Sequence, residues 1–172
     1  MRRAIKDNYK IIIIIILLIL IIILKLFLNS NYEKNRDRYL TKKGFKKEEE
    51  LFIRDDGKKI DIYNPLNNSL TRNYRYELDG VVCNYQGIYK DNYIHYTMSW
   101  QYLYKEEIRS GVYSVKTGEF NDKDKDEFSK EARTLSADFS IYIVDLYKNK
   151  NMKENRHKDV IDDSIKNRNN FK

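Results

Sequence analysis

The sequence predicts an α+β protein: one N-terminal transmembrane helix, followed by a small domain with an antiparallel β-sheet and one or two helices. Three observations lead to this fold class. Residues 11–28 are all Ile, Leu or Phe except for Lys25. Residues 51–104 contain runs in which apolar and polar residues alternate. Residues 124–136 place their apolar side chains at helical spacing, which indicates a helix after the sheet.

The apolar segment 11–28 has the length and composition of a membrane span. As a helix it is about 27 Å long, close to the roughly 30 Å of a bilayer's hydrocarbon core. Lys25 lies near one end, from where its side chain reaches the interface. Tyr9 and Phe27 bracket the segment at the depth where aromatic rings collect. We therefore expect a signal-anchor helix over residues 11–28.

A cleaved signal peptide is the main alternative, because a basic start followed by an apolar stretch is typical of that class too. The segment lacks the small-x-small pattern at which such peptides are cut. If Ser30 were the last residue removed, Leu28 would occupy the position that requires a small residue. A helix buried in a soluble core is a further alternative, but nothing else in the chain is apolar enough to surround it.

The charges on the two sides of the segment do not by themselves determine its orientation. Four bases precede it, whereas seven follow within about twenty residues, and cytoplasmic flanks are enriched in Lys and Arg. Long domains, however, are translocated largely regardless of charge, and residues 29–33 contain no base. We therefore expect residues 1–10 in the cytoplasm and the larger part of the chain outside. The flanking bases are Arg2, Arg3, Lys6 and Lys10 before the segment, and Lys34, Arg36, Arg38, Lys42, Lys43, Lys46 and Lys47 after it.

The net charge of +7 belongs to the two ends of the chain. Residues 1–28 and residues 148–172 each carry a net +4, whereas residues 29–147 carry 20 bases and 21 acids. A nearly neutral central region argues against nucleic acid as a partner. Cys83 is the single cysteine, which excludes an intramolecular disulfide and a cysteine-based zinc site. The abundance of Ile, Lys, Asn and Tyr indicates an AT-rich coding sequence, as in low-GC Gram-positive bacteria.

Residues 29–44 predict a polar helical stalk that leaves the membrane. Lys42 and Lys43 occupy its last turn, and Gly44 takes the left-handed position that ends many helices. An α+β domain is expected over residues 45–147, outside the cytoplasm.

That domain is predicted to begin with a hairpin around Asp56-Gly57, followed by a loop at residues 64–68. Apolar residues alternate with polar ones on both sides of the turn: Leu51 and Ile53, then Ile60 and Ile62. The next alternating run is Tyr74, Tyr76 and Leu78, closed by Asp79-Gly80.

The longest predicted strand covers residues 93–104. Its even-numbered residues from Ile94 to Tyr104 form an apolar face, which we expect to be buried. Its odd-numbered residues from Tyr93 to Gln101 form the opposite face, which we expect to be exposed to solvent and call the wet face. A short strand at residues 112–115 is then bounded by Gly111 and Gly118.

The C-terminal part is predicted to contain a helix, a strand and a tail. Phe128, Ala132 and Leu135 lie on one side of the helix over residues 124–136, and Asp124 with Glu127 resembles a capping box. Residues 139–145 are the most hydrophobic after the anchor and predict a central strand. The polar tail, residues 148–172, is expected to be disordered.

The chain contains no convincing catalytic, cofactor-binding or metal-binding set. Residues 122–133 begin like a calcium loop but have Glu127 where glycine is needed and Arg133 where glutamate is needed. With a turn at residues 91–92, His95 pairs with residue 88, so Cys83 lies about 17 Å further along the sheet. Acidic residues are too numerous to single out a pair for glycoside chemistry. We therefore assign no site residue and no cofactor.

The tyrosines of residues 74–104 allow two interpretations. One is a ligand platform in which Tyr93 and its wet-face neighbours stack on sugars or a peptide. The other, which we favour, is ordinary packing between strands.

An apolar helix followed by a polar helix and a sheet resembles the layout of type IV pilins and pseudopilins. The glycine-phenylalanine cleavage point of that class and its glutamate early in the apolar helix are absent here. The resemblance implies a subunit of an envelope apparatus.

The sequence therefore predicts a single-pass protein of the bacterial cell envelope with a binding or assembly role and no catalysis. The expected partners are the lipid bilayer and another envelope protein or cell-wall component, with no nucleic acid. Two alternatives stay open: a pilin-like subunit, and an enzyme that acts on cell-wall glycan through paired carboxylates.

Overall fold

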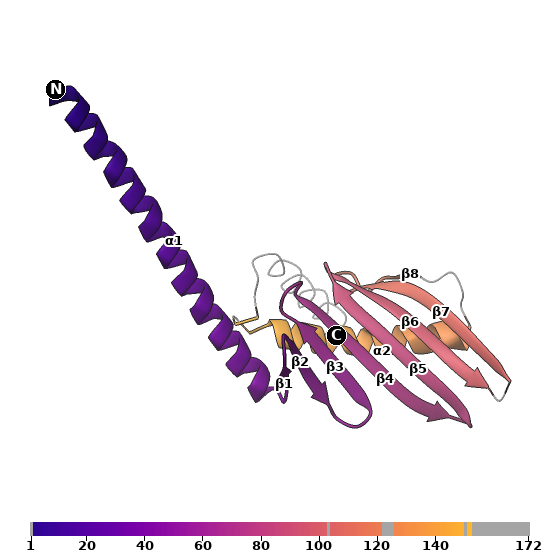
Figure 1. Ribbon diagram of the computed structural model, residues 1–172. Helices are drawn as coiled ribbons and strands as arrows, with labels where there is room; N and C mark the ends of the chain where they lie inside the picture. The colour runs from indigo at the N-terminus through magenta and orange to yellow at the C-terminus, as the bar shows by residue number, and fades with distance from the viewer. Residues whose placement is uncertain (1, 103, 122–125, 150, 153–172) are drawn as a thin grey trace. The chain divides into compact units, whose positions relative to one another are not determined.

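The computed structural model describes residues 2–102, 104–121, 126–149 and 151–152, and it divides into two compact units, residues 1–39 and 40–172. Helix α1 (Arg2–Lys42) makes up the first unit and contributes its last residues to the second. An eight-stranded antiparallel sheet and helix α2 (Glu127–Tyr147) form the second unit (Figure 1). This confirms the predicted α+β class. Disorder is predicted for the tail, residues 148–172. Of these the structure describes only residues 148–149 and 151–152.

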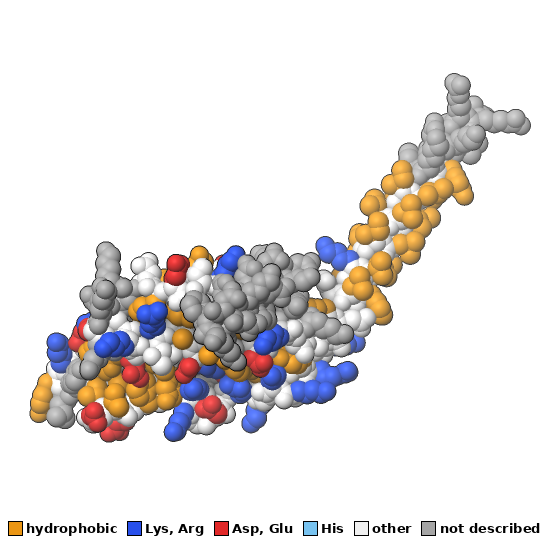
Figure 2. All heavy atoms as spheres, turned by 180° about the vertical axis from the view of Figure 1, so that it is seen from behind, with side chains coloured by type: hydrophobic (Ala, Val, Ile, Leu, Met, Phe, Trp, Pro, Cys, Tyr) orange, Lys and Arg blue, Asp and Glu red, His pale blue; other side chains and the backbone are white. Residues whose placement is uncertain are grey.

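Helix α1 is long and apolar enough to span a membrane or to act as a signal sequence. Figure 2 shows its hydrophobic side chains gathered along the helix. Every side chain from Ile12 to Leu28 is exposed, unlike the buried helix of a soluble core. The helix ends as predicted, because Gly44 has a φ of +89° and the Phe45 N–H bonds to the Leu40 carbonyl.

The sheet is a meander in which each strand pairs with the next along the chain. Its turns use residues that tolerate positive φ, including Asp79-Gly80 and Asp91-Asn92, as two-residue hairpins require. The strands are β1 (Lys46–Glu48), β2 (Leu51–Asp55), β3 (Lys59–Asn64), β4 (Ser69–Leu78), β5 (Val81–Lys90), β6 (Tyr93–Tyr102), β7 (Lys105–Ser114) and β8 (Phe120–Asn121).

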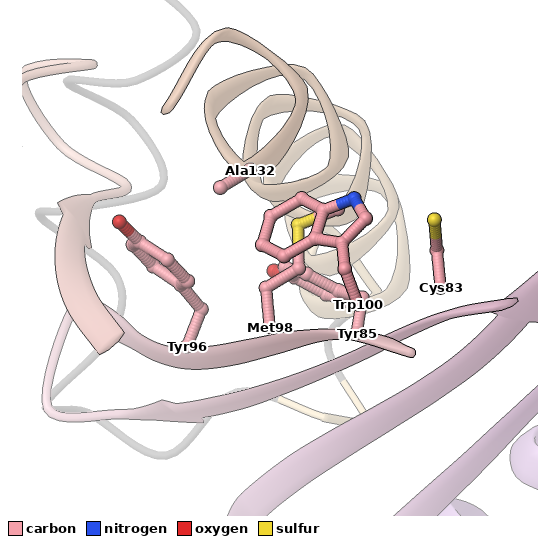
Figure 3. Packing of buried hydrophobic residues seen from close by; sticks show 6 residues of the cluster. All are labelled: Cys83, Tyr85, Tyr96, Met98, Trp100 and Ala132. Carbon is pink, nitrogen blue, oxygen red and sulfur yellow. The ribbon is translucent and has the colours of Figure 1, made fainter. Parts of the chain in front are cut away.

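One face of the sheet packs against α2, and no described helix covers the other, which we call the open face. On β6 the predicted division is confirmed for residues 93–101, since Ile94, Tyr96, Met98 and Trp100 are buried while alternate residues are exposed or half-buried. The strand is shorter than predicted, however: Tyr104 lies beyond its end and is 99% exposed. A buried cluster lies between the sheet and α2: the side chains of β5 and β6 rise toward Ala132 of the helix (Figure 3). Its sheet members are Cys83, Tyr85, Tyr96, Met98 and Trp100.

In the β2–β3 hairpin the turn is as predicted, but the apolar alternation marks the open face. Phe52 pairs with Tyr63 and both are buried, whereas Ile53 pairs with Ile62 on the other side of the sheet. Ile60 is 38% exposed. Both faces of this hairpin carry apolar residues, so alternation alone does not indicate which face a helix covers.

The short strand predicted at residues 112–115 is wrong in extent, because β7 begins at Lys105 and runs through Gly111. Gly111 does not end the strand. A Cβ at this position would lie 2.5 Å from the Tyr96 hydroxyl oxygen, so glycine leaves room for the tyrosine ring on the neighbouring strand. The two-residue β8 strand was not predicted.

The central strand predicted at residues 139–145 is also wrong, because this segment belongs to α2. Ala132, Phe139, Ile143 and Tyr147 are buried at helical spacing, while Ile141 is 54% exposed. The helix begins after Asp126, whose carboxylate accepts a hydrogen bond from the Ser129 N–H at 3.0 Å. Asp124, the predicted cap, lies outside the described residues.

Candidate functional site

The open face of the sheet carries a continuous uncharged surface, which we call the neutral face. Strand alternation and the pairing register place its members on one side of β2 to β7. All of them are exposed or half-buried. The neutral face consists of Ile53, Ile60, Ile62, Thr71, Asn73, Asn84, Gln86, Ile88, His95, Thr97, Ser99, Ile108, Ser110 and Val112.

This composition differs from that of the chain, in which 34% of the residues are charged. The charged residues of the same face lie at its border: Lys46, Glu48, Asp55, Arg75, Glu77, Lys90 and Glu106. Depletion of charge at the centre of a patch, with charges around it, is typical of surfaces that bind other proteins.

Polar side chains on the neutral face hold one another across the strands. The Gln86 amide donates to the Asn73 side-chain oxygen at 2.9 Å, and the Thr97 and Ser110 hydroxyls lie 3.2 Å apart. A shallow depression of about 400 Å³ includes Asn73, Gln86 and Thr97 in its lining, together with two bases at the border of the face, Lys58 and Arg75. The amides retain hydrogen-bonding capacity beyond these contacts, so the face offers both apolar and polar groups to a partner.

Tyrosines of residues 74–104 serve mainly in packing, which agrees with the favoured interpretation. Tyr85, Tyr89 and Tyr96 are buried, and the rings of Tyr85 and Tyr96 lie 6.4 Å apart with an interplanar angle of 12°. Tyr93, proposed as part of a platform, is 46% exposed beside the neutral face. It lines a separate depression with Val112.

A buried ion-pair cluster lies on the α2 side of the sheet. The Asp61 carboxylate is fully buried and binds Arg54 at 2.5 Å and the Arg72 Nε at 2.7 Å. The Arg72 guanidinium also lies over the rings of Phe139 and Tyr142, at 4.8 and 4.5 Å from their centroids. With both arginines committed to Asp61, the cluster joins the sheet to α2 and serves structure.

Cys83 and His95 are not brought together. The register confirms that His95 pairs with Ile88, while Cys83 pairs with Trp100. The thiol side chain faces α2 and the imidazole lies on the neutral face. Burial raises the pKa of the Cys83 thiol, which opposes formation of the thiolate that a nucleophile requires.

Two carboxylates that lie near each other are both occupied by Arg109. Glu107 binds this guanidinium at 3.0 Å and Asp126 binds it at 2.5 Å. The Ser129 backbone N–H is the main cause of the lowered pKa of Asp126, which is opposite to the raised pKa of a general acid. This arrangement provides no support for the glycan-enzyme alternative. Within the described ranges no group of three or more His, Cys, Asp or Glu is arranged to hold a metal ion.

Comparisons with protein-family models, with curated proteins and with solved structures found no match to this chain. Its candidate site therefore depends on geometry alone. Sequence reasoning did not identify the neutral face. The available signal was the absence of charge at alternate positions along residues 84–88 and 95–99.

Proposed function

We propose that this chain is a single-pass membrane protein, N-terminus in the cytoplasm, whose extracytoplasmic domain has an assembly role without catalysis. Its apolar helix supports the anchor, because the apolar side chains from Ile12 onward are exposed over a length that suits a bilayer. The neutral face is the observation that carries the assembly role. Its occupant in this proposal is a second copy of the same chain.

The size of the neutral face is compatible with such an interface. Six strands about 4.8 Å apart cover roughly 500 Å² if the patch extends over about five residues of each strand, of which only alternate ones face it. Two copies would then bury about 1,000 Å², near the lower limit for a specific interface.

Charge also favours a second copy as the occupant. In a two-fold symmetric contact the same patch lies on both sides, so a charged patch would repel itself. The neutral face avoids this penalty, whereas its border carries charges of both signs. Anchoring in one membrane would raise the effective concentration of the copies and allow a weak contact to form.

Cysteine crosslinking tests this contact. We expect at least one of Asn73→Cys, Gln86→Cys and Thr97→Cys to form a disulfide-linked dimer when membranes holding the full chain are oxidised. The native Cys83 is fully buried and provides a low background. Asp138→Cys, at an exposed position on α2, is the matched control and should stay monomeric. Equal dimer yields from the control, or monomers from all three variants, would contradict the proposal.

Topology has its own test. We expect Asp138→Cys to react with a membrane-impermeant thiol reagent in intact cells, on a protein that remains in alkali-washed membranes. Its mass should correspond to the full 20.8 kDa chain. Labelling only after lysis would place the domain in the cytoplasm. A shorter product, or release into the medium, would instead indicate signal-peptide or pilin-type processing.

A further inference from the structure

A depression of about 400 Å³ opens on the α2 side of the sheet, remote from the neutral face. We call it the Glu131 pocket. Apolar and polar side chains both line it, and two carboxylates lie among them: Asp79, which is exposed, and Glu131, which is half-buried. The residues that matter here are Leu78, Val81, Trp100, Phe128, Lys130 and Glu131.

Two aromatic rings give the pocket a rigid wall. Trp100 is 6% exposed, and its ring centroid lies 3.7 Å from that of Phe128 with an interplanar angle of 72°. Figure 3 shows the Trp100 indole and the Cys83 thiol rising from the sheet toward α2. Aromatic faces attract cations, and Trp is the most effective of them.

Glu131 is half-buried, and no described residue supplies it with a countercharge. Its Oε1 accepts a hydrogen bond from the Tyr76 hydroxyl at 2.8 Å, and within the described part of the chain it forms no ion pair. Lys130 also lines the pocket, but its own side chain is exposed. Burial is the main cause of the raised pKa of Tyr76, so the phenol stays protonated and holds the carboxylate in place.

We propose that the Glu131 pocket binds an alkylammonium group, a compact cation on a short apolar stem. The cation would pair with the Glu131 carboxylate, which binds no cation among the described residues, and the stem would lie against the apolar side chains of the pocket. A free amine and a lysine side chain of a peptide share this chemistry. The volume is at the lower end of the range for small-ligand pockets, which suits a stem of a few carbons. This inference is independent of the assembly role proposed for the neutral face.

Fluorescence provides a direct readout, because Trp100 is the only tryptophan of the chain. The full chain in dodecyl maltoside is titrated with butylammonium chloride, and with butan-1-ol as its uncharged counterpart. We expect a saturable change with butylammonium and binding at least about tenfold weaker with butan-1-ol. Nα-acetyl-lysine-N-methylamide forms a second arm. If it also binds, the pocket accepts a peptide side chain; if only butylammonium binds, it selects free amines.

A charge-removing variant identifies the group responsible. Glu131→Gln keeps an acceptor for the Tyr76 hydroxyl, so the domain should fold, and butylammonium affinity should fall at least about tenfold. Asp138→Asn makes the same charge change at an exposed position of the same helix and should bind like the wild type. Unaltered affinity in Glu131→Gln, equal affinity for butan-1-ol, or no saturable change would overturn the proposal.

Discussion

Replacing Asp61 with alanine is expected to destabilise the domain by about 3–5 kcal/mol, the usual cost of removing one partner from a buried ion pair. The carboxylate is fully buried and neutralises two guanidinium groups. Without it, Arg72 would remain buried against Phe139 and Tyr142 with its positive charge uncompensated on the carboxylate side. Charge burial of this kind is far more costly than the loss of a surface contact.

Urea unfolding of the full chain, followed by Trp100 fluorescence, measures the effect. Asp145→Ala is the matched control, because Asp145 pairs with Lys43 at 3.1 Å on the exposed side of the domain. This second loss should cost at most about 1 kcal/mol. If the two variants unfold at the same urea concentration, the Asp61 cluster contributes no more than a surface pair.

Replacing Ile141 with proline is expected to cost about 3 kcal/mol or more. Ile141 lies in the interior of α2, where proline removes a backbone hydrogen bond and clashes with the preceding turn. Its side chain is 54% exposed, so little of the loss would come from packing. The result depends on the backbone conformation of residues 139–145, for which the sequence pattern predicts a strand.

Ile141→Ala is the control for the side chain. Alanine favours helix more than isoleucine does, so this variant should stay within about 0.5 kcal/mol of the wild type. The same urea titration compares both variants. Similar unfolding midpoints for the proline and alanine variants would mean that α2 does not continue through this position.

Elements with a strong local pattern were predictable. The apolar segment follows from its length, the end of α1 from Gly44, and the β5–β6 register from the Asp91-Asn92 turn. In each case one physical requirement acts on neighbouring residues: bilayer thickness, left-handed backbone geometry or a two-residue turn. Each of these requirements selects particular residue types at neighbouring positions, so the sequence alone shows them.

Elements whose conformation depends on distant partners were not predictable. Residues 139–145 are apolar almost throughout, and a short apolar run suits a buried strand as well as a buried helix. The sheet leaves one face for α2 to cover, and only a helix in that place buries Phe139 and Ile143 together while it exposes Ile141. The requirement for glycine at position 111 is a similar case, because it comes from the Tyr96 ring on the neighbouring strand β6.

By itself the sequence determined that the chain starts with an apolar helix and continues into an antiparallel sheet with a helix. Only the tertiary structure decided which face of each strand is covered, and therefore that Asp61 is buried while Ile60 is exposed. Both candidate sites depend on that decision. The neutral face consists of residues that strand pairing gathers from six strands, and the Glu131 pocket forms where α2 meets β4 to β6. Alternation assigns residues to two faces, but the packing of α2 determines which face meets the solvent.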